Sequence, residues 1–144
     1  MAILTNDTSQ GCEFSGSLKT VTEERVWLFS GGLRQDPGWP KKNIHTDLEF
    51  AKSCGLPTRA ASAAMFEGYL TELMIDLFGV NWLKEGKMSL KFIAIVDVGD
   101  KLLPKAVVQS KEAEDSGVRF VMEVWCENQH GNKVVVGTAT GWVR

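Results

Sequence analysis

The chain has 144 residues, of which 44% are hydrophobic and 24% are charged, and its formal net charge is −2. This composition is typical of a single soluble globular domain that buries its core without disulfide support. The sequence shows neither a basic face of the kind that binds nucleic acid nor a polybasic run that binds a membrane surface. We therefore expect no nucleic-acid partner and no membrane partner.

The cysteines and the start of the chain predict a cytoplasmic protein. Cys12, Cys54 and Cys126 are odd in number and widely spaced, which is typical of reduced thiols and not of a disulfide framework or a zinc site. Because the sequence has only two histidines, we expect no metal site. Residues 1–7 lack the basic and apolar segments of a secretory leader, and we expect residues 1–12 to be polar and flexible.

The first predicted elements are a short strand and a helix. The strand is expected over residues 13–20, where the chain leaves its polar start. Thr22 is the expected N-cap of the helix, because its hydroxyl can accept a hydrogen bond from a free N–H in the first turn. The pair Gly31-Gly32 is expected to end this helix.

A loop rich in Gly, Pro and Trp follows, up to Lys42, and leads to a second short helix. Thr46 and Glu49 form a T-x-x-E pattern, which predicts a capping box at the start of that helix. Asp47 favours the positive end of the same helix, and Gly55 is expected to end it.

Residues 60–78 predict a long central helix that ends at Gly79. At the helical period, one face carries apolar side chains: Phe66, Leu70, Leu73, Met74 and Leu77, with Ala63 and Tyr69 beside them. The same window contains Glu67, Glu72 and Asp76, which excludes a membrane span.

After residue 87 the period of the hydrophobic pattern changes from helical to two. Four strands are expected, with turn residues between them: 88–96, 101–113, 117–128 and 133–143. One early strand, then helices, then a run of antiparallel strands predicts an α+β fold, with one domain over residues 1–144 and the sheet around the central helix.

Residues 44–51 read I-H-T-D-x-E-F-A, which resembles the second half of the signature of the MaoC-like acyl-CoA dehydratases and hydratases, G-D-x-N-P-x-H followed by D-x-x-F/Y-A. The family order of a K/R-F strand, a G-D turn and a final hairpin has counterparts at residues 90–92, 98–100 and 137–140. The resemblance covers residues 18–144. It implies a hot-dog fold and a dimer in which each active site is built from two chains.

The first half of the signature is different in this chain. Pro40 stands where the family has its aspartate, Lys42 stands for the asparagine, and Asn43 stands for the proline. The family sequence H-G-M at the start of the central helix reads Ala63-Ala64-Met65. His45 is therefore present without its usual acid partner.

The resemblance implies that His45 is a general acid or base beside an acyl thioester, since imidazole transfers protons near neutral pH. The alternative is an ordinary loop or positioning residue. Asn43, Asp36 or a backbone carbonyl could orient the imidazole. Asp36 and Glu67 are the candidates to replace the missing acid, although Glu67 could equally be a solvated carboxylate on the edge of the apolar face.

Two further groups of residues are candidates for binding the thioester. The backbone N–H groups of Ala63, Ala64 and Met65 could stabilise an oxyanion at the helix start, or could belong to a plain helix start that packs closely. Four basic side chains could bind the phosphates of coenzyme A, or could be solvated surface residues: Arg34, Lys41, Lys42 and Arg59.

We therefore expect an acyl-thioester-binding hot-dog protein, a divergent enoyl-CoA hydratase or 3-hydroxyacyl-CoA dehydratase. It needs no cofactor, because coenzyme A or an acyl-carrier protein is part of the substrate. The expected assembly is a homodimer or higher oligomer, or a heterodimer with a second hot-dog subunit, and Trp125 and Trp142 are expected near strand edges that a partner could cover. The alternatives are a non-catalytic acyl-binding or accessory subunit, and a thioesterase that uses Glu67.

Overall fold

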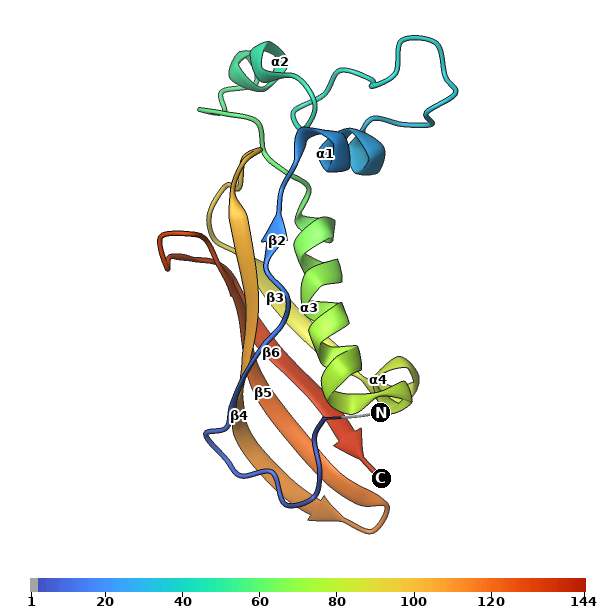
Figure 1. Ribbon diagram of the computed structural model, residues 1–144, viewed down its shortest axis with the longest axis vertical. Coiled ribbons are helices and arrows are strands. Elements are labelled where there is room, and N and C mark those ends of the chain that lie inside the picture. Colours follow the sequence, from blue (N-terminus) through green and yellow to red (C-terminus); the bar gives the residue numbers. More distant parts are fainter. Residues whose placement is uncertain (1–2) are drawn as a thin grey trace.

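The computed structural model describes residues 3–144 as one curved antiparallel sheet with a long helix along one face (Figure 1). The elements in chain order are β1 (Glu13–Ser15), β2 (Lys19–Thr20), α1 (Glu23–Ser30), α2 (Leu48–Ser53), α3 (Ala63–Phe78), α4 (Val80–Glu85), β3 (Lys87–Phe92), β4 (Lys101–Glu114), β5 (Gly117–Glu127) and β6 (Lys133–Val143). The strand order is β1-β4-β5-β6-β3, and β2 also pairs with β4. The predicted α+β architecture is confirmed.

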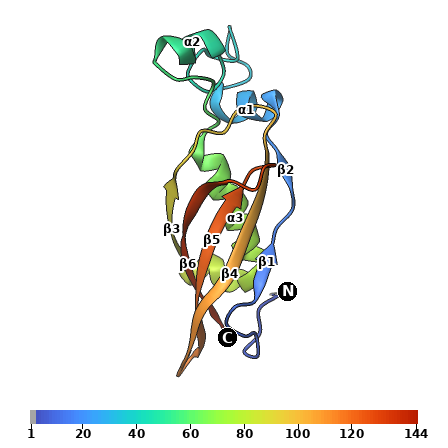
Figure 2. The same ribbon diagram turned by 90° about the vertical axis from the view of Figure 1, so that its left-hand side faces the viewer.

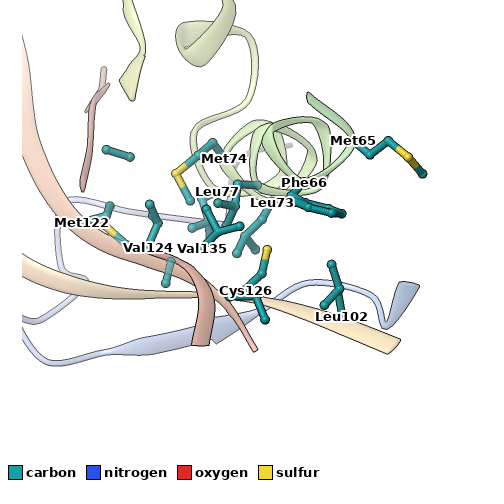
Figure 3. Packing of buried hydrophobic residues seen from close by; sticks show 14 of the residues in the cluster. Met65, Phe66, Leu73, Met74, Leu77, Leu102, Met122, Val124, Cys126 and Val135 are labelled. Atoms are coloured by element: carbon teal, nitrogen blue, oxygen red, sulfur yellow. The ribbon is translucent and has the colours of Figure 1, made fainter. Parts of the chain in front are cut away.

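The helix α3 forms the core with the sheet. Its buried side chains include the whole predicted face, namely Phe66, Leu70, Leu73, Met74 and Leu77, and add Met65 and Phe78. Alternate residues of β5 point at it, because successive side chains of a strand lie on opposite faces of the sheet. Figure 3 shows Leu73 and Leu77 directed at Val124 and Cys126. Each fully buried aliphatic side chain contributes about 1.5–3 kcal/mol.

The start of α3 lies three residues later than predicted. The N–H of Ala60 donates to the carbonyl of Ile44 at 3.1 Å, and the N–H of Ala61 donates to the carbonyl of Val96 at 2.7 Å. These tertiary hydrogen bonds hold residues 60 and 61 outside the helix. The helix ends before Gly79 as predicted, where the chain takes a φ of 62° that glycine adopts without strain.

The predicted capping box of α2 is wrong, because Asp47 and not Thr46 is the N-cap. The Asp47 side chain accepts from the N–H of Phe50 at 2.8 Å. Thr46 instead donates its hydroxyl to the carbonyl of Lys41 at 2.6 Å and accepts from the N–H of Asn43 at 3.1 Å. Thr46 therefore closes the preceding loop. In α1, Thr22 is the N-cap as predicted, and it accepts from the N–H of Arg25 at 3.3 Å.

The first strand also departs from expectation. The expected strand over residues 13–20 is split into β1 and β2 where the chain passes Pro104 of β4, which accepts from the N–H of Gly16 at 2.9 Å but has no N–H to donate in return. Residues 1 and 2 lie outside the described residues. Within the rest of the segment that was expected to be flexible, Leu4 is buried, and its N–H donates to the carbonyl of Leu77 at 3.0 Å. The expected flexibility of residues 3–12 stays a prediction.

The last three predicted strands are present within a residue of their expected bounds, but β3 ends at Phe92 and not at residue 96. The helix α4 was not predicted. Trp125 does not lie near a sheet edge, because β5 is an interior strand, and its ring is covered by the Lys133 ammonium at 4.4 Å from the ring centre. Trp142, in β6, donates to Glu114 at 2.9 Å.

The segment from α1 to α2 lies beyond one end of the sheet (Figures 1 and 2). It contains the Gly/Pro/Trp loop and His45, and it is joined to the start of α3 by the backbone hydrogen bond between Ala60 and Ile44. In residues 3–144, no helix is both long and apolar enough to span a bilayer.

Candidate functional site

His45 lies half-buried in the loop before α2 and is tied to the segment before α3. Its Nδ1 is hydrogen-bonded to the carbonyl oxygen of Ala60. A carbonyl oxygen can only accept, so Nδ1 carries the proton of the neutral ring and Nε2 is left with the lone pair. Of the orienting groups considered from the sequence, the backbone carbonyl is the one in contact with the ring.

Asn43 holds the backbone of this loop and not the imidazole. Its Oδ1 accepts from the N–H of His45 at 2.9 Å and from the N–H of Thr46 at 3.2 Å. Its Nδ2 donates to the carbonyl of Ser30 at 2.8 Å, at the end of α1. The Asn43 amide therefore fixes the position of His45 relative to α1, although Asn43 does not contact the ring nitrogens.

The first turn of α3 offers free backbone donors next to this loop. The N-cap Ser62 makes no side-chain capping hydrogen bond. Among the described residues, the N–H groups of Ala63 and Ala64 have no hydrogen-bond partner, whereas the N–H of Met65 donates to the carbonyl of Ser62 at 3.0 Å. The two free donors and the positive end of a 16-residue helix favour an oxygen with negative charge. Ala63 and Ala64 thus fit the oxyanion role better than Met65.

Neither candidate replacement acid contacts the imidazole. The Asp36 carboxylate pairs with the Lys41 ammonium at 3.2 Å. Glu67 is exposed on α3 and makes no hydrogen bond or ion pair with another residue of the described chain. Within residues 3–144, the hydrogen bonds of His45 go to Asn43 and Ala60 and to no carboxylate.

The four candidate basic residues do not form one cluster. Arg59 is mostly buried and joins α1 to the loop between β3 and β4: it pairs with Glu23 of α1 at 2.7 Å and lies 3.7 Å from Asp97. Lys41 is paired with Asp36, and Lys42 lies 3.8 Å from the N-cap Asp47. Arg34 is exposed and has no ion-pair partner among the residues described. Arg34 is therefore the residue of this group that is free to meet a ligand.

Two hollows flank the start of α3. One, of about 510 Å³, lies between α1 and α3, and we call it the α1–α3 groove. Its lining is Lys19, Arg25, Leu28, Phe29, Ala64, Met65, Gly68, Tyr69 and Glu72. The other, of about 360 Å³, lies between the start of α3 and residues 92–96, and it includes Ala60, the hydrogen-bond partner of His45.

Tyr69 is the least expected residue of the α1–α3 groove. Its hydroxyl is buried and has no hydrogen-bond partner among residues 3–144. Burial raises the pKa of Tyr69, and the positive charges of Arg25 and Lys19 oppose this effect without cancelling it. The sequence placed Tyr69 beside the apolar face of α3, but no local pattern indicates that Lys19 and Arg25 meet it there.

The described residues can bind and polarise a carbonyl group at the start of α3 and transfer a proton through Nε2 of His45. They also offer a groove with an apolar wall and charged groups. Within residues 3–144, no group of three His, Cys, Asp or Glu side chains is arranged to hold a metal ion.

No protein-family model and no curated protein sequence matches this chain. Solved structures do match. The R-hydratase PhaJ1 from Pseudomonas aeruginosa is 20% identical, with a TM-score of 0.72, over 95% of this chain and 83% of that one. The MaoC-like dehydratase from Rhodospirillum rubrum is 18% identical, with a TM-score of 0.73, over 99% of both chains.

A third match is a complex, the HadBC 3R-hydroxyacyl-ACP dehydratase from Mycobacterium tuberculosis. A chain of it is 16% identical to this one, with a TM-score of 0.68, over 96% of this chain and 100% of that one. Identities at this level establish the fold alone. The hot-dog fold expected from the sequence is thereby confirmed, in the form that MaoC-like dehydratases and hydratases share.

Proposed function

We propose that this chain binds an acyl thioester and catalyses the addition of water to a trans-2-enoyl thioester, or the reverse dehydration of a 3-hydroxyacyl thioester. The observation that carries the proposal is the hydrogen bond from Nδ1 of His45 to the carbonyl of Ala60. It brings a proton-transfer group with a free Nε2 to within three residues of the uncapped start of α3.

In the proposed reaction, the thioester carbonyl accepts hydrogen bonds from the N–H groups of Ala63 and Ala64. Nε2 of His45 takes a proton from water as the water oxygen bonds to C3 and the C2–C3 double bond becomes an enolate. The protonated ring then returns a proton to C2 and the carbonyl re-forms. No electrons are gained or lost, so the reaction requires no cofactor, and coenzyme A or an acyl-carrier protein enters only as the carrier of the substrate.

Two proteins with this fold support the reaction class, an R-hydratase and a 3R-hydroxyacyl-ACP dehydratase. The site itself supports it through residues that are in place for a proton transfer and for an oxyanion. Arg34 is the candidate to bind the phosphates of the carrier, because it is exposed and free of ion pairs in the described chain.

We also propose that two chains assemble, as a homodimer or with a second hot-dog subunit. β3 is an edge strand, and an unpaired edge is a template for another strand. Apolar side chains are exposed at its last residue and just after it: Phe92, Ile93 and Ile95. HadBC is a complex of chains with this fold, which supports an assembly of the same kind.

The second candidate function is a non-catalytic acyl-binding or accessory subunit. The observation that favours it is the absence of a carboxylate from the hydrogen bonds of His45 within residues 3–144. A base that acts on water works better when a second group holds the water, and Asp36 is engaged by Lys41 instead. On this alternative the chain binds acyl thioesters and leaves them unchanged.

The test is the rate of hydration of a short trans-2-enoyl-CoA by the wild type and by three variants. His45→Ala removes the ring, whereas His45→Asn keeps an N–H donor for the Ala60 carbonyl and removes Nε2. Both should lower kcat/KM by about two to four orders of magnitude. The matched control is His130→Ala, which removes the exposed histidine of the β5–β6 hairpin and should leave the rate unchanged.

Equal rates in wild type and folded His45→Asn would exclude His45 as the proton-transfer group. Binding of acyl-CoA by the wild type without hydration of any enoyl-CoA would establish the accessory-subunit alternative.

A further inference from the structure

The α1–α3 groove has an apolar part next to the start of α3. Leu28 and Phe29 of α1 form one wall, and both are about half exposed. The floor is made by the small residues Ala64 and Gly68, which are four positions apart and so lie on the same side of the helix. A Cβ built on Gly68 would meet no atom within 4 Å. This part of the groove therefore offers apolar contact and empty space to a chain-like ligand.

The far part of the groove is charged. Lys19 forms an ion pair with Glu72, and its ammonium lies 5.9 Å from the centre of the Tyr69 ring. Arg25 donates through one Nη to the carbonyl of Thr20 at 3.0 Å, which leaves its other donors available. The lining therefore holds two cations against the one carboxylate of Glu72, together with the unpartnered Tyr69 hydroxyl.

We propose that the α1–α3 groove binds the tail of the acyl group and selects tails that end in a carboxylate. This inference rests on the proposed function for the identity of the ligand as an acyl thioester. A terminal carboxylate can accept from the Tyr69 hydroxyl and from the Arg25 guanidinium, and it balances the excess positive charge. An alkyl tail satisfies none of these donors and leaves the buried hydroxyl without a partner.

The spacing along α3 sets the length of the tail. Tyr69 is five residues beyond Ala64, which corresponds to about 7.5 Å along the helix axis. An extended carbon chain advances about 1.25 Å per bond, given C–C bonds of about 1.5 Å. This rise is a lower bound on the span, because five residues also turn by about 140° around the helix. A thioester carbonyl at the Ala64 N–H and a carboxylate at Tyr69 therefore need at least about five or six bonds between them, as in a six- or seven-carbon dicarboxylic half-thioester.

The experiment measures affinity by isothermal titration calorimetry with saturated thioesters, which cannot be hydrated. The acyl group of adipoyl-CoA has six carbons and a terminal carboxylate, and that of hexanoyl-CoA has the same length without the carboxylate. Coenzyme A alone measures how much of the affinity comes from the carrier. We expect adipoyl-CoA to bind about ten- to one-hundredfold more tightly than hexanoyl-CoA. Succinyl-CoA, which is two carbons shorter, should lose most of this preference.

Two variants locate the preference in the groove. Tyr69→Phe removes only the hydroxyl and should reduce the ratio of the two affinities, with hexanoyl-CoA unaffected. Glu72→Gln removes an exposed carboxylate that competes for Lys19, so it should increase the ratio. If Tyr69→Phe does not fold, Glu72→Gln still tests the proposal, because this second variant is expected to bind the anionic tail more tightly.

Equal affinities for adipoyl-CoA and hexanoyl-CoA, or binding of neither, would overturn the inference. The inference would also be overturned if Arg25→Gln lowered the affinities for adipoyl-CoA, hexanoyl-CoA and coenzyme A by the same factor. Arg25 would then bind the phosphates of the carrier and not the tail. A preference for adipoyl-CoA in a protein that hydrates no enoyl-CoA would retain the groove assignment and reject the catalytic one.

Discussion

Nδ1 of His45 donates a hydrogen bond to the carbonyl oxygen of Ala60, 15 residues further along the chain. This contact joins the loop beyond the end of the sheet to the segment that leads into α3. Because a carbonyl oxygen can only accept, the contact assigns the ring proton to Nδ1 and the lone pair to Nε2. The position and the tautomer of the proposed catalytic group therefore depend on the same hydrogen bond.

Substitution of Arg59 should lower the stability of the fold, whereas substitution of Arg34 should weaken ligand binding. Arg59→Gln breaks the ion pair with Glu23 and leaves the Asp97 carboxylate with one partner fewer, so the free energy of unfolding should fall by about 1–3 kcal/mol. Arg34→Gln should change it by less than about 0.5 kcal/mol but weaken the binding of coenzyme A. Urea denaturation and calorimetry measure the two effects. Weaker binding of coenzyme A by a fully stable Arg59→Gln protein would contradict this division.

Cys126 should make the protein less stable at alkaline pH. Burial raises the pKa of its thiol from 9.0 to about 12, so above pH 9 the unfolded state loses a proton that the folded state keeps. The stabilisation is complete below pH 9 and is lost as the pH rises toward 12, on the order of 1–2 kcal/mol by pH 10.

Urea denaturation at a series of pH values measures this decline. Cys126→Ala should flatten it, although the smaller side chain lowers stability at neutral pH. The control, Cys54→Ala, removes an exposed thiol and should leave the pH dependence unchanged. An equally steep decline in Cys126→Ala would assign the effect to other groups, of which Tyr69 is the first to test because burial raises its pKa as well.

Gly68→Ala should stabilise the fold and impair the groove. Alanine in a helix interior is about 0.5–1 kcal/mol more favourable than glycine, and a Cβ at this position meets no atom within 4 Å. The added methyl group occupies the floor of the α1–α3 groove, so hexanoyl-CoA should bind more weakly. The contrasting variant is Gly141→Ala, whose Cβ would lie 2.8 Å from the Phe78 ring and should lower the melting temperature. A destabilised Gly68→Ala protein would show that this glycine has a structural role.

The edge strand should mediate assembly. We expect light scattering to report a dimer or larger species at micromolar concentration, and Ile93→Glu to shift it toward the monomer, because a buried unpaired carboxylate is costly at an interface. Ile93 is 56% exposed in the single chain. Leu83→Glu is the matched control, since Leu83 is 68% exposed on α4. A wild-type monomer would remove the two-chain model of the site.

The elements of this fold could be predicted where local patterns decide them. The apolar face of α3 and the three long strands follow from periodicity, and Thr22 caps α1 as its sequence context indicates. The start of α2 could not be predicted, because Thr46 can cap a helix or close a loop, and the carbonyl of Lys41 decided the outcome. The position of that carbonyl cannot be predicted from local sequence preferences.

The candidate site could be predicted only in part for the same reason. His45 stands out in the sequence, and the start of the central helix at residues 63–65 could be named as a source of N–H donors, although an ordinary helix start offers the same groups. The partner of the imidazole is a backbone carbonyl, and every residue has one. The groove brings together Lys19, Arg25 and Tyr69 from a strand and two helices. These three residues are close together because β2, α1 and α3 pack against one another, and their spacing in the sequence does not predict this proximity.

The position of His45 beyond the end of the sheet affects how the loop that carries it unfolds locally. The loop that carries it is held by the Asn43 amide and by a few backbone hydrogen bonds, and Thr46 is the one polar residue of the described chain that is buried there. Little apolar surface would be exposed if this loop detached, so its amide protons should exchange with solvent by a local opening while α3 and the strands stay protected. We therefore expect the loop that carries the proposed reactive residue to open and close separately from the hydrophobic core.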